Sequence, residues 1–340
     1  MGAEPVLAVE GLRVTFPAPG GAAVRAVDGL DLAVAAGETV GIVGESGSGK
    51  SAAMLAVMGL LPGRARVGGS VRFRGEELLG RPEKELRRLR GGKLAMVFQD
   101  PGSSLNPVLT VGRQIAEAVR AHQGGSRGDA RRRAVELLAA VGVPSPATAV
   151  DRHPHELSGG MRQRVLIATA VANDPEVLIL DEATTALDVT VQAQVLELVA
   201  SIQARTGCAV LLVSHDLGVV AGLADRVAVV YAGRVVEHGP VDDVLGAPVH
   251  PYTRALLDCL PRATAGPRVR LTPIAGQPPS PAALPAGCPF HPRCPAAVTG
   301  PGGPCDARVP APVAVAPGHE AACHFVAPAS RDRRGAGAAP

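Results

Sequence analysis

Residues 44–51 read GESGSGKS, which fits the pattern G-x-x-x-x-G-K-S/T of a loop that binds nucleotide phosphates. Its glycines let the backbone curl so that successive N–H groups point at phosphate oxygens. We expect Lys50 to bridge the β- and γ-phosphates and the Ser51 hydroxyl to ligate Mg²⁺. A glycine-rich turn is the alternative, but the motif lies between a strand-like TVGIVG and a helix-like SAAMLAVMGLL, as a phosphate loop requires. The residues predicted to line the nucleotide are Gly44, Glu45, Ser46, Gly47, Ser48, Gly49, Lys50 and Ser51.

A second chemical pattern is VLILDE at residues 177–182, an apolar strand that ends in two carboxylates. Burying carboxylates without a partner is costly, so such a strand end needs a reason. Beside a phosphate loop, we expect Asp181 to hold Mg²⁺ directly or through water, and Glu182 to polarise the attacking water as general base. A strand end capped by solvated acids is the alternative, and the phosphate loop favours the catalytic interpretation.

A second anion site is indicated by LSGGMRQR at residues 157–164. Ser158 and the two glycines after it stand before a helical pattern, so they offer a hydroxyl and unencumbered backbone N–H groups to an anion. An ordinary helix cap is the alternative. Because the phosphate loop lies far upstream, the motif alone leaves open which anion it faces.

Composition narrows the class of protein. The chain has 340 residues, of which 46% are apolar, enough for one large domain or two modest ones. The formal net charge of +3 is too small to indicate a nucleic-acid partner. The N-terminus lacks the features of a secretory signal, and no apolar run approaches the roughly 18 residues of a membrane span. We therefore expect a cytosolic protein whose six cysteines are reduced unless they hold a metal.

The elements that must position these motifs follow from the hydrophobic pattern. Residues 6–45 alternate apolar and polar, as short strands separated by turns would. Helical and strand-like patterns alternate over residues 161–245, which predicts a largely parallel, helix-covered sheet. Between about 105 and 157 the pattern is helical and more charged. After about 260 Pro and Gly become dense and periodicity fades, which indicates a separate small extension.

Over roughly residues 6–245 the chain resembles the nucleotide-binding subunits of ABC transporters. The resemblance implies an α/β fold of the P-loop NTPase class, with a mixed-sheet core, an antiparallel β-subdomain and a helical subdomain at about 105–160. The expected domains are a nucleotide-binding domain at 6–255 and a four-cysteine C-terminal extension at 256–328, and the composition of the last residues predicts a disordered tail at 329–340. The motifs that carry the resemblance occur in that family's order: GESGSGKS, Gln99, LSGGMRQR, VLILDE, ALD at 186–188, and His215 in SHD.

In this family two such domains face each other head to tail. The resemblance therefore implies that Ser158, Gly159 and Gly160 bind the γ-phosphate held by the partner's phosphate loop, which supplies the missing anion. Asp188 would organise the interface between the two subunits. ATP would then join the subunits, and hydrolysis would release them.

The same resemblance assigns the remaining site residues. Gln99 would sense the γ-phosphate and complete the Mg²⁺ ligands, and His215 would contact the γ-phosphate and hold the geometry of attack. Together with Glu182 they form the predicted catalytic set. Phe16 occupies the place of the aromatic residue that stacks on adenine, and a strand core residue is the alternative there.

Several segments resemble the peptide-importer branch of the family: QDPGSSLNPVLTVG at 99–112, Met161, HPYTRALLDCLP at 250–261, GQPP at 276–279 and GCPFHPRCP at 287–295. This branch implies an energy-coupling ATPase for di- or oligopeptide import at the cytoplasmic face of the membrane. Its partners would be two membrane permeases, a second ATPase (or a second copy of this chain) and an extracellular solute-binding protein. Import of nickel or another small solute is the alternative, followed by a soluble ABC ATPase without a transport role.

The extension carries Cys288, Cys294, Cys305 and Cys323. Their spacing fits neither a zinc ribbon nor a ferredoxin. Four thiols in a Pro-rich segment with little hydrophobic core nevertheless suggest a structural metal site that stabilises the segment. The branch resemblance favours a 4Fe–4S cluster, with zinc second and reduced cysteines third, and nearby histidines leave a mixed Cys/His zinc site open. Pro281 departs from the branch's pattern, which usually has a large apolar residue there.

Overall fold

The computed structural model describes the chain except for residues 1–3, 18–22, 100–103, 185–186, 260–272 and 328–340. Several predictions touch these gaps. The disordered tail at 329–340 lies outside the described residues, as do parts of the segments 99–112 and 250–261, part of the extension at 256–328, and the first residue of the ALD motif, Ala186.

An eight-stranded mixed sheet forms the centre of the molecule, in the order β11-β12-β10-β9-β3-β8-β7-β6. Its middle strands run parallel and are apolar and buried, as expected for a sheet covered on both faces. Parallel strands place their carboxyl ends at one edge, where the predicted catalytic residues follow. The parallel strands are β3 (Thr39–Val43), β6 (Leu94–Val97), β7 (Val177–Asp181), β8 (Ala209–Ser214) and β9 (Arg226–Tyr231).

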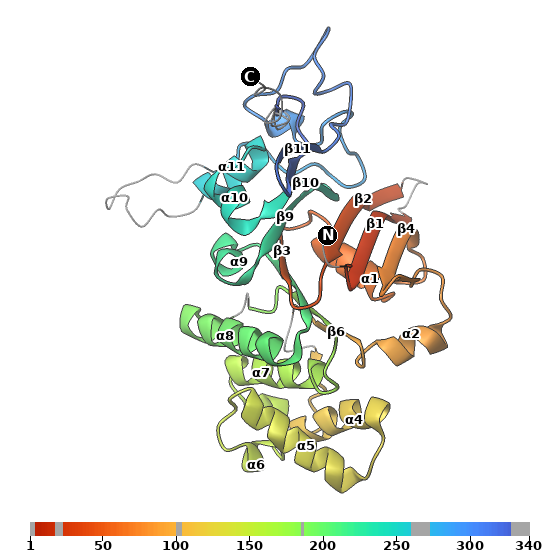
Figure 1. The fold of residues 1–340 in the computed structure, drawn as a ribbon, viewed down its shortest axis with the longest axis vertical. Coiled ribbons are helices and arrows are strands. Elements are labelled where there is room, and N and C mark those ends of the chain that lie inside the picture. Colours follow the sequence, from red (N-terminus) through yellow and green to blue (C-terminus); the bar gives the residue numbers. More distant parts are fainter. Residues whose placement is uncertain (1–3, 18–22, 100–103, 185–186, 260–272, 328–340) are drawn as a thin grey trace, which may run out of the picture.

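A second, antiparallel sheet in the order β2-β1-β4-β5 lies beside the central one (Figure 1). Helix α1 (Lys50–Val57), which follows the phosphate loop, packs between the two sheets. Its Met54 shares one hydrophobic cluster with Val9 of the antiparallel sheet and Ile179 of the central sheet. The antiparallel strands are β1 (Leu7–Pro17), β2 (Ala23–Val34), β4 (Arg66–Phe73) and β5 (Glu76–Glu77).

Helices form a layer at the end of the molecule opposite the C-terminal extension (Figure 1). Of these, α7 packs against β6 and so connects the layer to the central sheet. The predicted α/β class, with a mixed sheet, an antiparallel β-subdomain and a helical subdomain, is confirmed. The helices of this part are α4 (Val111–Gln123), α5 (Arg127–Ala140), α6 (Pro146–Ala149) and α7 (Gly159–Ala170). The remaining helices up to residue 258 are α2 (Glu83–Leu89), α8 (Val189–Thr206), α9 (Leu217–Leu223), α10 (Val241–Gly246) and α11 (Pro251–Asp258).

The C-terminal extension joins the central sheet, although the sequence pattern indicates a separate unit. Strand β12 (His319–Ala321) pairs antiparallel with β10 (Arg234–Pro240), and β11 (Val313–Ala316) pairs with β12. Nε2 of buried His319 lies 2.8 Å from Oε1 of Glu237 on β10, which ties the two strands together. The extension therefore shares its sheet with the rest of the chain. Among the described helices, none combines the length and apolarity needed to cross a bilayer.

Candidate functional site

The phosphate loop leaves the carboxyl end of β3 and enters α1 at Lys50. Two of its glycines are required by close backbone contact. A Cβ at Gly44 would lie 2.1 Å from the carbonyl oxygen of Val230, and one at Gly49 would lie 2.2 Å from that of Ala26. Both also have positive φ values, of 152° and 102°, where side chains are disfavoured. The loop is thus held against β9 and β2 with its backbone free to face a ligand.

Lys50 is buried inside this loop. Its Nζ donates to the carbonyl oxygens of Gly44 at 2.7 Å and Glu45 at 2.9 Å. Burial lowers the pKa of Lys50, and the carboxylates of Glu182 and Asp181 oppose that effect. An ammonium in this position is a localised cation surrounded by backbone dipoles, which suits a phosphate group.

The Ser51 hydroxyl donates to Oδ1 of Asp181 at 2.9 Å, so the predicted metal ligands from α1 and β7 are adjacent. Burial raises the pKa of Asp181, and the hydrogen bond from Ser51 opposes it. A hydroxyl and a carboxylate oxygen are hard ligands that suit Mg²⁺. The residues present therefore fit a magnesium ion, whose charge would also offset the burial of Asp181.

Three residues that follow different strands meet around one carboxylate. Oε2 of Glu182, directly after β7, accepts a hydrogen bond of 2.9 Å from Nε2 of Gln99, which lies just beyond β6. Nδ1 of His215, directly after β8, lies 3.5 Å from the same oxygen. Glu182 has a φ of 48°, a left-handed conformation that non-glycine residues rarely adopt. The structure thus brings the predicted catalytic set together at the edge where β6, β7 and β8 end.

The predicted signature residues lie at an exposed helix start, apart from this group. The Ser158 side chain caps α7 by accepting a hydrogen bond of 3.3 Å from the backbone N–H of Met161. Asp188 caps α8 in the same way, with Oδ1 accepting from Val191 at 3.0 Å. A Cβ at Gly160 would lie 2.6 Å from Cγ1 of Val191, so the two capped helix starts are neighbours. Among the described residues, Ser158 bonds to its own helix, and its exposed hydroxyl faces solvent.

Phe16 is half-buried and packs against the hydrophobic cluster between the two sheets. This packing is what the alternative interpretation, a residue of the strand core, predicts. Stacking of Phe16 on adenine stays a prediction. Sequence reasoning missed three residues near the phosphate loop: Tyr231, Tyr252 and Arg293, which contact Glu45 or one another. Tyr252 and Arg293 lie in segments that carried the branch resemblance, but no local pattern placed them beside Glu45.

The four cysteines of the extension lie close enough to influence one another. Burial raises the pKa of Cys288 and Cys294, and the neighbouring thiols, Cys305 and Cys323 included, raise it further. Each nearby histidine has one ring nitrogen beside an oxygen atom; Nδ1 of His291, for example, lies 2.9 Å from the carbonyl oxygen of Cys288. Within the described part of the chain, no group of three or more metal-binding side chains is arranged to hold an ion.

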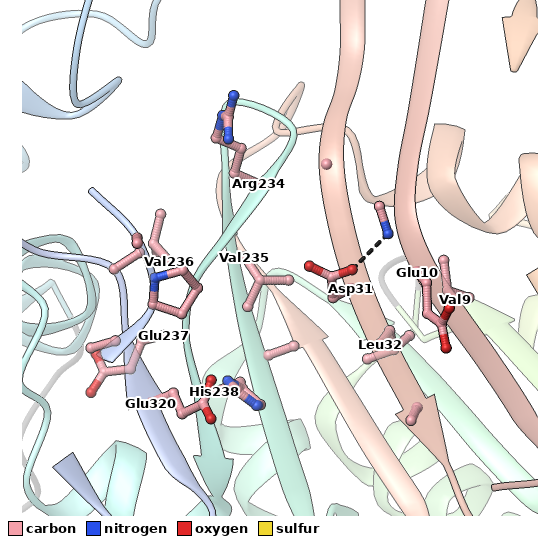
Figure 2. Close-up of a pocket in the computed structure, with 18 of the residues that line it drawn as sticks. Val9, Glu10, Asp31, Leu32, Arg234, Val235, Val236, Glu237, His238 and Glu320 are labelled. Carbon is pink, nitrogen blue, oxygen red and sulfur yellow. Dashed lines mark hydrogen bonds between the residues drawn. The ribbon is translucent and has the colours of Figure 1, made fainter. Parts of the chain in front are cut away.

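One cavity lies apart from the phosphate loop. It has a volume of about 680 Å³ and is lined by strands β1, β2, β9 and β10 together with the extension. Figure 2 shows the acidic side chains of Glu10, Asp31 and Glu320 in the lining of this cavity, with Glu320 beside His238. Asp31 is engaged by the backbone N–H of Gly11 at 2.6 Å. None of the predicted catalytic residues lines this cavity, so its volume is no evidence that it is the site of catalysis.

Comparison with known proteins agrees with the motifs. The ABC transporter family matches residues 27–185, and the family "Oligopeptide/dipeptide transporter, C-terminal region" matches residues 236–300. The chain is 50% identical to the oligopeptide transport ATP-binding protein OppD of Salmonella typhimurium, over 87% of this chain and 88% of that protein. It is 53% identical to the protein of the same name from Mycobacterium tuberculosis, over 94% of this chain, but it spans only about half (52%) of that relative's length.

The fold also matches solved structures. A dimeric ATP-binding cassette in a post-hydrolysis state, bound to ADP and Pi, superposes with a TM-score of 0.63 at 27% sequence identity. The match covers 69% of this chain and 98% of that one.

Proposed function

The chain belongs to the ABC transporter family, in the branch of oligopeptide and dipeptide transport ATP-binding proteins, and we propose that it is the ATP-hydrolysing, energy-coupling subunit of a peptide importer. The observation that carries the hydrolytic part is the convergence of Lys50, the Ser51–Asp181 pair and the Gln99–Glu182–His215 group at one edge of the sheet. The assignment to peptide import is supported by the printed names of the relatives and the C-terminal family match.

In the proposed reaction the loop's N–H groups bind the phosphates of ATP. Lys50 Nζ exchanges its bonds to Gly44 and Glu45 for oxygens of the β- and γ-phosphates. Glu182 accepts a proton from the attacking water, while Gln99 and His215 hold its carboxylate in place from two sides. Ser51 and Asp181, with Gln99, would hold Mg²⁺, which would supply positive charge to the phosphate oxygens.

The second half of each ATP site would come from another ATPase subunit. Ser158, Gly159 and Gly160 stand at the start of α7, a helix of 12 residues, with the hydroxyl exposed. Such a helix start favours an anion, and the γ-phosphate bound to the facing subunit is the anion proposed. Asp188 lies beside it and would contact the same interface. The dimeric state of the solved cassette supports this arrangement.

We further propose two membrane permeases, a second ATPase subunit and an extracellular solute-binding protein as partners, with this chain at the cytoplasmic face of the membrane. The test is purification in mild detergent from native membranes, followed by identification of the accompanying chains. Two polytopic permeases and a second ATPase support the importer, and the solute that the accompanying binding protein retains distinguishes peptides from nickel. Recovery from the soluble fraction alone, without a membrane protein, would overturn the transport role.

We also propose a 4Fe–4S cluster at Cys288, Cys294, Cys305 and Cys323, because neighbouring thiols add to the effect of burial in raising the pKa of Cys288 and Cys294. The side chains as they stand form no single-ion site, so no step of the reaction is assigned to it. Iron and labile sulfide are measured on anaerobically prepared protein, together with its visible spectrum. About four irons per chain support the cluster, whereas one zinc in a colourless protein supports the second choice.

A further inference from the structure

The extension makes a two-pronged ion pair with the phosphate loop, in which Arg293 is buried and Glu45 is half-buried. Nη1 of Arg293 lies 2.6 Å from Oε2 of Glu45, and Nη2 lies 3.0 Å from Oε1. These two residues are 248 positions apart in sequence. Parallel hydrogen bonds of this kind fix the relative orientation of the two planar groups as well as joining their charges. The pair is therefore a directional contact between the extension and the nucleotide site.

Arg293 is held firmly enough to act as an anchor. Its side chain is only 4% exposed. Nε donates to the carbonyl oxygen of Ala275 at 3.0 Å, Nη1 lies 3.3 Å from the Tyr231 hydroxyl, and the guanidinium carbon is 5.9 Å from that ring's centroid. Its bonds to Glu45, first among several causes, raise the pKa of Arg293 further above its usual range. The guanidinium thus stays charged and has little freedom to turn.

Glu45 is the residue through which this anchor reaches the lysine of the loop. Its carbonyl oxygen accepts from Lys50 Nζ at 2.9 Å, and its backbone N–H donates to the hydroxyl of buried Tyr252 at 2.9 Å. Its carboxylate is also near enough to act on the charge of Lys50. The carboxylate and the backbone N–H of Glu45 are therefore held by Arg293 and Tyr252, while its carbonyl oxygen contacts Lys50.

The extension contacts the loop's surroundings at a second place. The backbone N–H of Arg25, on β2, donates to the carbonyl oxygen of Pro281 at 3.0 Å. Pro281 and Leu284 line a small cavity together with Ser46 and Gly47 of the loop. Pro281, which departs from the branch's usual pattern, is half-buried in this contact. Two separate segments of the extension thus lie next to the phosphate loop.

We propose that Arg293 is a positioning residue for ATP binding: it holds the Glu45 carboxylate neutralised and turned to the extension, so that the loop accepts a triphosphate. The inference rests on the proposed ATPase function and deepens it. A carboxylate released beside the loop would repel the phosphates and compete for Lys50, so the loss would fall on ATP affinity. Hydrolysis of bound ATP would change little, because Glu182 and its neighbours are positioned by β6, β7 and β8.

The test compares ATP binding by the full-length chain, titrated with a fluorescent ATP analogue, with the rate of the assembled transporter at saturating ATP. We expect Arg293→Met to raise the Kd about tenfold, while kcat stays within about twofold. The double variant Arg293→Met/Glu45→Gln, which removes the freed charge, should return the Kd to within about threefold of wild type. Arg308→Gln is the matched control, since it removes an exposed arginine of the same extension and should leave the Kd unchanged.

Thermal unfolding is measured for every variant. If Arg293→Met does not fold, Arg293→Lys replaces it, which keeps the charge and loses the two-pronged geometry, and a Kd increase of about threefold is expected. An unchanged Kd in the folded Arg293 variant would overturn the inference, as would a double variant that binds no better than the single one, because a purely structural role gains nothing from Glu45→Gln. A wild-type chain that fails to bind ATP would overturn the proposed function itself, and this inference with it.

Discussion

Replacing Glu182 with glutamine tests the assignment of the general base most directly. The amide is nearly the same size as the carboxylate, and its oxygen can still accept the hydrogen bond from Gln99 Nε2 that Glu182 accepts at 2.9 Å. The substitution therefore removes the proton acceptor and one negative charge while keeping the packing at the end of β7.

The magnitude follows from the two properties that are lost. General base catalysis contributes about 10²- to 10⁴-fold, so the barrier to hydrolysis should rise by about 3 to 5 kcal/mol. Glu182 is also the carboxylate that acts most strongly on the charge of Lys50. Removing that charge leaves the phosphates less repelled, so the affinity for ATP should be unchanged or higher.

The assay is phosphate release in a single turnover, combined with light scattering of the ATP-bound protein. The expected result is hydrolysis at or below one hundredth of the wild-type rate together with an ATP-trapped dimer. Glu85→Gln, the same chemical change at an exposed glutamate on α2, is the control and should hydrolyse ATP normally. Hydrolysis by Glu182→Gln above one tenth of the wild-type rate would show that another group accepts the proton.

Three further outcomes are expected. Lys50→Ala should abolish binding of a fluorescent ATP analogue, because the loop of residues 44–51 loses its only lysine, and binding within tenfold of wild type would contradict this. Ser158→Arg should leave ATP binding by the isolated chain intact but stop turnover of the assembled transporter, and normal turnover would exclude action across the dimer. Burial lowers the pKa of His250 to about 4, so the unfolded chain binds the extra proton between pH 6.5 and 4. The free energy of unfolding should fall by up to about 3 kcal/mol as the pH drops through that window. Urea unfolding of His250→Gln should show a smaller fall. An equal fall in that variant would contradict the assignment to His250.

Much of the phosphate site was predictable because it is local in the sequence. GESGSGKS specifies its own backbone course through glycines that must lie against Val230 and Ala26, and the strand pattern before it predicts where the loop stands. The strand ends carrying Asp181 and His215 could be placed at one edge because parallel strands align their carboxyl ends. The α/β class followed from the same alternation of helical and strand patterns.

The helix starts at Ser158 and Asp188 show a different limit. The Ser158 motif indicates a helix start, and Ser158 caps α7; Asp188 was predicted only as an interface residue, and in the structure it caps α8. Their proximity, through Gly160 and Val191, depends on how α7 packs against its neighbours. Their proposed contact with ATP involves a second subunit, which the structure of one chain does not contain. The turnover of the Ser158→Arg variant in the assembled transporter tests that contact.

The sequence by itself determined the phosphate loop, the acidic strand end and the order of the motifs, because each is encoded in a few adjacent residues with a fixed periodicity. Only the tertiary structure decided that the extension belongs to the central sheet, through β12 and the His319–Glu237 contact, and that Arg293 meets Glu45. The physical reason is that a Pro- and Gly-rich segment has no periodic hydrophobic pattern from which its packing partner could be predicted. The extension is held by individual buried charges and backbone hydrogen bonds. These contacts form only when parts of the chain that are distant in sequence pack together.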